Sequence, residues 1–186
     1  AVPNNVSTEP SGPGFIPCSV PDLRGNEATY LRACIDDNWV SSAGPFVTQF
    51  EEQVGRLVGG AHAVATVNGT AALHLALLVC GVAPGDEVIV PDWTFAATAN
   101  AVYQAGATPV FVDVEADSWS LAPECVEAAL QARGDSIKAV VVVHPMGSPA
   151  NVHALQALCE RFDVPLVEDA AGAVGAACNG TPVGAL

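Results

Sequence analysis

Four consecutive valines, Val140 to Val143, are the feature that most narrows the folds open to this chain. They close an apolar run that begins at Ile137 and shows no polar alternation after Lys138. A strand of this composition has both faces buried, which is typical of a parallel sheet with helices on each side. Comparable runs recur along the chain, and the sequence predicts strands at residues 63–67, 87–90, 109–114, 137–143 and 165–168.

Helical patterns fill the intervals between these runs. Apolar residues recur at helical spacing at residues 70–80, 94–104, 123–132 and 150–162, and two amphipathic helices are predicted before them, at 26–38 and 46–58. Strands that alternate with helices predict an α/β fold with a mainly parallel, doubly wound sheet. Near the end of the chain, Asn179-Gly180 predicts a hairpin turn between two short apolar runs.

The N-terminal residues differ in composition from the rest. Residues 1–14 are rich in Pro, Gly, Ser and Asn, which predicts a flexible arm. Residues 15–186 are long enough for one domain with its own core. Hydrophobic residues make up 51% of the chain and the mean hydropathy is +0.37, which excludes a disordered protein. Because these values are high for a domain that is fully exposed to water, we expect further protein to cover part of its surface.

Charge and cysteine content limit the partners and the compartment. The formal net charge is −14 with only six Lys and Arg residues, which excludes nucleic acid and anionic membranes as partners. Six cysteines occur without a C-x-x-C pair, and no zinc-ligand spacing is present, so we expect free thiols and no metal. The N-terminus lacks a basic segment followed by an apolar one, and the longest apolar stretch is interrupted by His74 and Gly81. These features predict a cytoplasmic protein.

The segment Asn68-Gly69-Thr70 has the composition of an anion-binding turn. It follows a predicted strand and begins a predicted helix, whose first turn presents backbone N–H groups and the positive end of the helix dipole. Thr70 can add a hydroxyl donor, and the small Ala71 lets a ligand approach the backbone. The alternative is an ordinary strand-to-helix turn with a threonine cap, and the segment alone does not decide between the two readings.

Asp169 directly follows the apolar run Val164-Pro165-Leu166-Val167 and Glu168. It therefore belongs to the carboxyl end of a strand, where open α/β sheets bind ligands. A carboxylate at this place can hold a pyridinium nitrogen in its protonated form through a charge-assisted hydrogen bond. The alternative is a helix N-cap before Ala170-Ala171.

Two further segments follow strands. Pro91-Asp92-Trp93-Thr94-Phe95 offers an aromatic ring that could stack on a flat cofactor or pack in the core, and spacing does not separate Trp93 from Phe95. His144, after the valine run, is a candidate ligand or acid–base group, and the alternative is a hydrogen-bonded structural histidine.

In order and surroundings, these segments resemble the N-terminal part of the DegT/DnrJ/EryC1/StrS sugar aminotransferases, which are pyridoxal 5′-phosphate (PLP) enzymes of fold type I. The resemblance runs from about Phe15 to Leu186 and rests on WVSSAGPFVTQFEE, VNGTAALHLAL, GVAPGDEVIVPDWTFAATANAV, GATPVFVDV, VVHPMGSPAN and VEDAAGAVGA. The opening segment FIPCSVPDLRGNEATYLRACIDDNWVSSAG is most similar to members that aminate UDP-linked 4-keto-6-deoxy-HexNAc sugars on the bacillosamine and legionaminic acid routes.

The resemblance implies a fold and a set of site residues. The fold is the large PLP-binding domain, a three-layer αβα arrangement with a mainly parallel sheet that is incomplete at its C-terminal side. Gly69, Thr70 and Ala71 match the residues that bind the PLP phosphate. Phe95 matches the aromatic residue that stacks on the pyridine ring, and Asp169 matches the aspartate that pairs with the ring nitrogen.

The resemblance also implies a reaction. An amino acid, with glutamate as the expected donor, would transfer its amino group to the cofactor, which would then aminate a nucleotide-linked keto sugar for polysaccharide biosynthesis. Family members are usually homodimers, so the same state is expected here.

Two positions depart from the family pattern. Gly172 stands where relatives usually carry Gln, His or Glu near the phenolic oxygen of the cofactor. The Schiff-base lysine of the family is absent, since Lys138, the single lysine of the chain, belongs to a predicted strand elsewhere. The chain is therefore interpreted as a fragment of a longer enzyme.

Two other functions remain open on the sequence alone. One is a PLP-dependent sugar dehydratase of the same family, in which a histidine replaces the lysine. The other is a non-catalytic paralogue that keeps the binding site and has lost the chemistry.

Overall fold

The computed structural model describes residues 21–60 and 62–185 of the chain. The predicted arm at residues 1–14 and Cys18 lie outside the described residues. The chain divides into two compact units, Ala1–Gly44 and Pro45–Leu186. The boundary expected after residue 14 stays a prediction.

The described part of the first unit contains one helix, α1 (Glu27–Asp36), inside the range predicted at 26–38. Asn26 occupies the N-cap position, but its side chain makes no capping hydrogen bond. The apolar side chains expected along one face of α1 are not buried, and Tyr30, Leu31 and Ile35 are exposed.

A four-stranded parallel sheet forms the centre of the second unit. Its strands are β1 (Glu87–Pro91), β2 (Thr108–Val112), β3 (Ile137–Val143) and β4 (Leu166–Asp169), in the order β2-β1-β3-β4. In the register of β3 and β4, Val143 lies opposite Asp169, so these two strands end side by side. The predicted strand at 137–143 is confirmed at both ends, and the other three agree within a few residues.

The described part of the second unit contains five α-helices, and the last three of them each connect two strands of the parallel sheet. They are α2 (Pro45–Leu57), α3 (Gly69–Val79), α4 (Ala96–Gln104), α5 (Pro123–Arg133) and α6 (Val152–Phe162), with short 3-10 turns at Gly134–Ser136 and Pro145–Gly147. Each α-helix matches a predicted one within two residues at either end. None of the helices in the described residues is long and apolar enough to cross a membrane.

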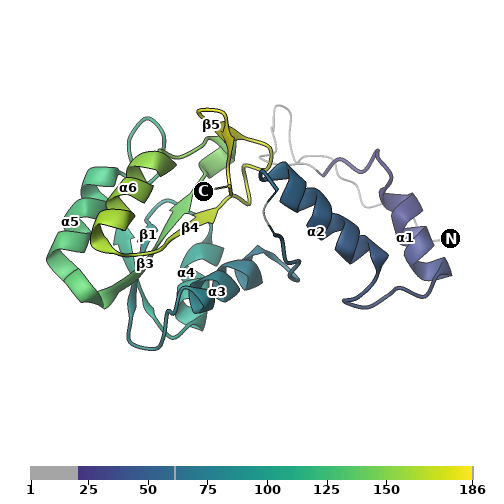
Figure 1. The fold of residues 1–186 in the computed structure, drawn as a ribbon, viewed down its shortest axis with the longest axis horizontal. Coiled ribbons are helices and arrows are strands. Elements are labelled where there is room, and N and C mark those ends of the chain that lie inside the picture. Colours follow the sequence, from purple (N-terminus) through teal and green to yellow (C-terminus); the bar gives the residue numbers. More distant parts are fainter. Residues whose placement is uncertain (1–20, 61, 186) are drawn as a thin grey trace, which may run out of the picture. The chain divides into compact units, whose positions relative to one another are not determined.

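A different helix pair covers each face of the sheet (Figure 1). On one face, Ile89, Val140 and Val142 belong to a cluster with side chains of α5 and α6. On the other face, Val88 and Val141 pack with side chains of α3 and α4. Successive residues of a strand point to opposite faces, so the uninterrupted valine run fills both clusters. The predicted three-layer αβα fold is confirmed.

The predicted strand at residues 63–67 is wrong. Residues 62–66 have no regular secondary structure and no ladder partner among the described residues, and Val64 and Val67 are exposed. The backbone N–H of Ala65 donates instead to Oε1 of Glu51 on α2, at 2.8 Å. An apolar run becomes a strand only where a neighbouring strand can pair with it, and residues 62–66 have no such neighbour in the described part of the chain.

The predicted hairpin turn is confirmed. Strands β5 (Ala177–Cys178) and β6 (Thr181–Pro182) pair antiparallel around Asn179-Gly180. Both turn residues have positive φ, 50° at Asn179 and 86° at Gly180, which is the geometry that favours Asn-Gly in a two-residue turn.

Candidate functional site

A cavity of about 670 Å³ lies at the carboxyl ends of β3 and β4, beside the first turn of α3. Ligands of open α/β sheets bind at this edge of the sheet. The cavity brings together segments that are up to about 100 residues apart in the sequence, and its walls are mostly apolar. It is lined by Asn68, Gly69, Thr70, Leu73, Trp93, Thr94, Phe95, Ala97, Val143, His144, Pro145, Met146, Asp169, Ala171 and Gly172.

The first turn of α3 forms one end of the cavity. Asn68 is the N-cap, and its Oδ1 accepts a hydrogen bond from the backbone N–H of Ala71 at 2.9 Å. The backbone N–H groups of Gly69 and Thr70 donate to no acceptor among the described residues. These two groups therefore remain available to an anion, together with the Thr70 hydroxyl. The cap is Asn68 and not Thr70, and the N–H of Ala71 already has a partner.

Gly69 leaves space in front of this turn. A Cβ built on Gly69 would meet no atom within 4 Å, and the φ of Gly69 is not positive. A turn of the backbone therefore does not require glycine here. The absence of a side chain instead leaves the helix N-terminus open to close approach by a ligand.

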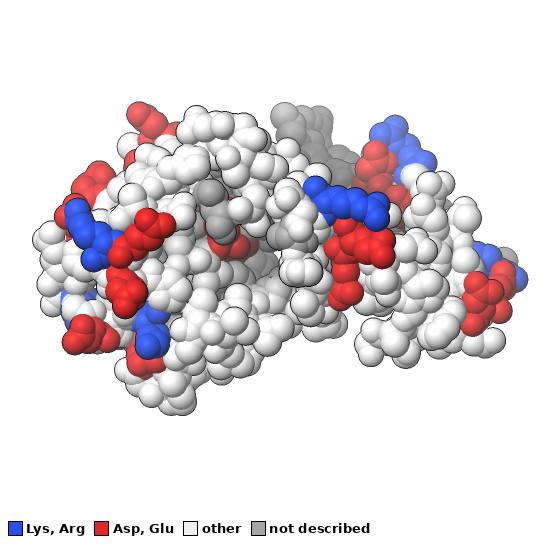
Figure 2. All heavy atoms as spheres, viewed as in Figure 1, with Lys and Arg blue, Asp and Glu red and all other residues white. Residues whose placement is uncertain are grey.

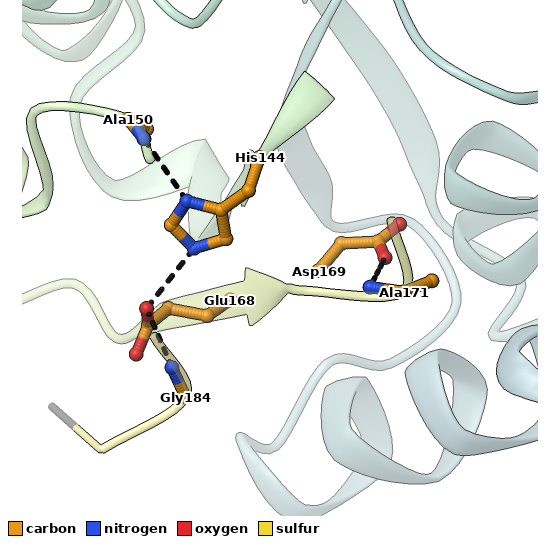
Figure 3. A network of polar contacts seen from close by, with 6 residues as sticks. All are labelled: His144, Ala150, Glu168, Asp169, Ala171 and Gly184. Carbon is orange, nitrogen blue, oxygen red and sulfur yellow. Dashed lines mark hydrogen bonds and ion pairs between the residues drawn. The ribbon is translucent and has the colours of Figure 1, made fainter. Parts of the chain in front are cut away.

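Asp169, at the end of β4, lines the same cavity. Its Oδ2 accepts from the Thr98 hydroxyl at 3.1 Å, and its Oδ1 accepts from the backbone N–H of Ala171 at 3.2 Å. In Figure 3 this carboxylate points away from the side of β4 that carries Glu168. No helix begins at Asp169, since residues 171–172 form a turn, so the helix N-cap alternative is wrong.

Both aromatic candidates line the cavity. Phe95 precedes α4, and 82% of its surface is exposed, so its ring is not part of the core. Trp93 is 48% exposed and packs edge-on against Trp119, with ring centroids 5.2 Å apart. The Trp93 ring thus has a partner of its own among the described residues, whereas the Phe95 ring has none.

His144 is a hydrogen-bonded structural residue, as the alternative reading predicted. It is 1% exposed, its Nδ1 accepts from the backbone N–H of Ala150 at 3.0 Å, and its Nε2 lies 3.1 Å from Oε2 of Glu168 (Figure 3). Since Nδ1 is an acceptor, the proton of the neutral ring resides on Nε2 and is donated to Glu168. The same Glu168 oxygen accepts from the backbone N–H of Gly184 at 3.1 Å, which ties β4 to the segment after the hairpin.

Cations are scarce at the cavity. No Lys or Arg is among its lining residues. Each of the five arginines forms an ion pair with a nearby carboxylate, and on the face viewed in Figure 2 the described basic side chains lie beside acidic ones. Across residues 21–60 and 62–185, no three His, Cys, Asp or Glu side chains are grouped closely enough to hold a metal ion. An anion in this cavity would be held by neutral donors from the described residues.

The sequence profile of the DegT/DnrJ/EryC1/StrS aminotransferase family matches residues 21–186. The chain belongs to this family. The resemblance found in the sequence segments is thereby confirmed for nearly the whole chain.

Two curated relatives share the family and a name. GDP-perosamine synthase of Vibrio cholerae is 41% identical over 170 residues, covering 91% of this chain and 46% of the relative. GDP-perosamine synthase of Caulobacter vibrioides is 42% identical over 171 residues, covering 92% of this chain and 45% of the relative. This family member thus spans about half the length of the curated relatives it matches. The narrower resemblance to the bacillosamine and legionaminic acid type stays a prediction.

Solved structures of the family have the same fold. A putative sugar aminotransferase from Streptococcus pneumoniae, solved in a PMP form, superimposes with a TM-score of 0.82 and 30% identity. The match covers 91% of this chain and 45% of that chain.

The structure locates Gly172 and Lys138, which concern the two departures from the family pattern. Gly172 lines the cavity, and a Cβ built on it would stand 3.6 Å from the carbonyl oxygen of His144, an ordinary contact. The backbone here would therefore accept a side chain. Lys138 lies at the amino end of β3, whereas the cavity lies at the carboxyl end of that strand.

Sequence reasoning missed three residues around the cavity. Thr98 and Thr94 connect to Asp169 through hydroxyl hydrogen bonds, and their i, i+4 spacing in Thr94-Phe95-Ala96-Ala97-Thr98 was the available signal. Met146, the single methionine of the chain, lines the cavity with positive φ (51°). Nothing in the sequence around Met146 indicates this conformation, because a bulky residue seldom adopts it.

Proposed function

We propose that the intact protein is a PLP-dependent aminotransferase that moves an amino group from an amino acid, with glutamate as donor, to a nucleotide-linked keto sugar. The observation that carries this proposal is the arrangement of one cavity. The open N-terminus of α3 lies at one end of it, Asp169 lines it, and the exposed ring of Phe95 is part of its wall. Membership of an aminotransferase family supports the same reaction class.

The phosphate end of the cofactor fits the start of α3. The N–H groups of Gly69 and Thr70 and the Thr70 hydroxyl offer three donors, and the helix dipole favours a dianion there. Ala71 contributes its small size more than its N–H, which Asn68 already occupies. The missing Cβ of Gly69 gives the phosphate room.

The ring end fits Asp169 and Phe95. Asp169 is acceptor-only when ionised and keeps lone pairs beyond those used by Thr98 and Ala171, so it can hold a protonated ring nitrogen. Phe95 offers an exposed aromatic face for stacking. When bound, PLP supplies the electron sink that amino transfer requires. Asp169 keeps the ring nitrogen protonated and thereby sustains that capacity.

The covalent link to the cofactor has to come from elsewhere in the intact protein. Lys138 lies at the wrong end of β3 for this task. We therefore assign the Schiff-base lysine to a residue outside this chain of 186 residues. A second subunit in a homodimer is the proposed source of cations for the sugar nucleotide, because none line the described cavity.

The names of the relatives support the substrate class, and the free cysteines support the compartment. Two relatives are named GDP-perosamine synthase, which supports a nucleotide sugar as acceptor. All five described cysteines are free, which supports a reducing compartment, and the cytoplasm is the proposed location.

The test uses the intact protein, PLP, isotope-labelled glutamate and a panel of GDP-, UDP- and TDP-linked keto sugars. Glutamate alone should change the visible absorbance of the bound cofactor, and mass spectrometry should then find the label in one amino sugar. Asp169→Asn should lower kcat by a factor of about 10²–10³ while the fold remains intact, because a charge that acts on the reacting system is lost. A protein that binds PLP but never transfers label to any sugar would contradict the proposal.

A further inference from the structure

A pair of threonines stands behind Asp169. The Thr98 hydroxyl donates to Oδ2 of Asp169 at 3.1 Å, and the hydroxyls of Thr94 and Thr98 lie 2.8 Å apart. We propose that Thr98, supported by Thr94, is a positioning residue that holds the Asp169 carboxylate in register with the ring nitrogen of the cofactor. This inference rests on the proposed PLP chemistry.

The direction of the hydrogen bonds follows from counting protons. A threonine hydroxyl has one proton, and an ionised carboxylate has none to give. Since Thr98 donates its proton to Asp169, Thr94 must donate to Thr98. The three groups form a one-way chain that ends on a charged acceptor, and such a chain is stronger than its isolated links.

Burial restricts the movement of this chain of hydrogen bonds. Thr98 is 1% exposed and does not line the cavity, whereas Thr94 and Asp169 do. A β-branched side chain in a helix has few rotamers, so the Thr98 hydroxyl has little freedom to turn away. The Thr98 hydroxyl therefore approaches Asp169 from the protein side and leaves the cavity side of the carboxylate open.

One helical turn carries both Phe95, which would stack on the cofactor ring, and Thr98, which holds Asp169. The backbone N–H of Thr98 donates to the carbonyl of Phe95 at 3.1 Å, so Phe95 and Thr98 belong to one turn at the start of α4. A shift of this turn would move the stacking face and the support of Asp169 together. Functional groups held in this way by surrounding hydrogen bonds keep the geometry that binding requires.

The decisive comparison uses two cofactors and two substitutions in the intact apoprotein. Thr98→Val keeps the shape and removes the hydroxyl, whereas Thr98→Ser keeps the hydroxyl. The affinity of each variant is measured by titration with PLP and with 1-deaza-PLP, in which carbon replaces the ring nitrogen. We expect Thr98→Val to bind PLP about ten-fold more weakly, the cost of one hydrogen bond to a charged group.

Binding of 1-deaza-PLP distinguishes a role of Thr98 in positioning Asp169 from a role in supporting the fold. Thr98→Val should bind 1-deaza-PLP as the unmodified protein does, because the analogue makes no bond to Asp169. Thr98→Ser should restore PLP affinity, and Thr94→Val should show a smaller loss of the same kind. Thr108→Val, an exposed threonine on β2, is the matched control and should change neither affinity.

Two results would overturn the inference. One is an equal loss of affinity for both cofactors, which would mean that Thr98 supports the fold and not Asp169. The other is an unchanged affinity of Thr98→Val for PLP. If the unmodified protein itself fails to bind PLP, the proposed function is wrong, and that outcome is distinct from both.

Discussion

At the first turn of α3, one missing Cβ sets how closely an anion can approach the backbone. Gly69→Ala would add a methyl group into open space in front of the free N–H groups. The apoprotein should be as stable as before or more stable by up to about 1 kcal/mol, since alanine is the better helix former. PLP affinity should fall at the same time.

The measurements for Gly69→Ala are a denaturant melt of the apoprotein and a PLP titration. Gly81→Ala is the contrasting variant, because Gly81 has positive φ (82°) and lies at the far end of α3. It should lose stability and keep its PLP affinity. Unchanged PLP binding by Gly69→Ala would show that the phosphate does not approach this turn.

Burial alters the ionisation of Cys159, on α6. It is 2% exposed, and desolvation raises the pKa of its thiol from 9.0 to about 11. A raised pKa in the folded state means that the unfolded chain loses its proton first, so stability is full below pH 9.0 and falls as the pH rises toward 11.

Unfolding measurements between these two pH values test this. The alkaline loss of stability should be smaller in Cys159→Ala than in the unmodified protein, because that variant has no thiol to ionise. Iodoacetamide should also label Cys159 more slowly than the half-buried Cys34 in the native state, and both should react alike after unfolding. Equal native rates would contradict the assigned burial.

At the scale of elements, one carboxylate joins three segments. Oε2 of Glu168 on β4 accepts from His144, at the end of β3, and from the N–H of Gly184, after the hairpin. Glu168→Gln should therefore loosen residues 177–184, because a neutral amide oxygen is a weaker acceptor than a carboxylate. We expect a loss of about 1–3 kcal/mol in unfolding free energy and faster hydrogen exchange at Gly184.

Glu160→Gln is the matched control for that change. Glu160 is exposed on α6, and among the described residues its carboxylate accepts from Gln156 alone, one turn away, so its replacement should cost less than about 0.5 kcal/mol. If the exchange rate of Gly184 were the same in both variants, the Glu168 contact would not hold the segment in solution.

The elements also show what the sequence could predict. The run Val140 to Val143 predicted a strand buried on both faces, and the structure places Val140 and Val142 in one helix-covered cluster and Val141 in the other. Residues 63–67 have similar composition but no neighbour to pair with in the part of the chain that the structure describes, and pairing is a property of the fold and not of the segment. Asp169 could be predicted as a site residue because it directly follows an apolar strand segment. Its hydrogen bond with Thr98, 71 residues away, could not be predicted, because it depends on how the chain folds.

Over the second unit, we expect the two faces of the sheet to contribute differently to cofactor binding. The cluster under α3 and α4 lies behind the first turn of α3, Thr98 and Asp169, whereas the cluster under α5 and α6 lies on the other side of the strands. The interior of a protein is close-packed, so truncation of a buried side chain disturbs its immediate neighbours most. Damage on either face should cost stability, and damage on only one should affect the cofactor.

Leu77→Ala on α3 and Leu155→Ala on α6 test this division, since both side chains are fully buried. Each substitution should lower the unfolding free energy of the intact protein by about 2–5 kcal/mol. At a temperature where both variants remain folded, only Leu77→Ala should bind PLP more weakly, because α3 carries the proposed phosphate contacts and packs against α4. Denaturant melts give the stability and PLP titrations give the affinity. A loss of affinity in Leu155→Ala as large as that in Leu77→Ala would mean that the site depends on the stability of the whole molecule and not on one face of the sheet.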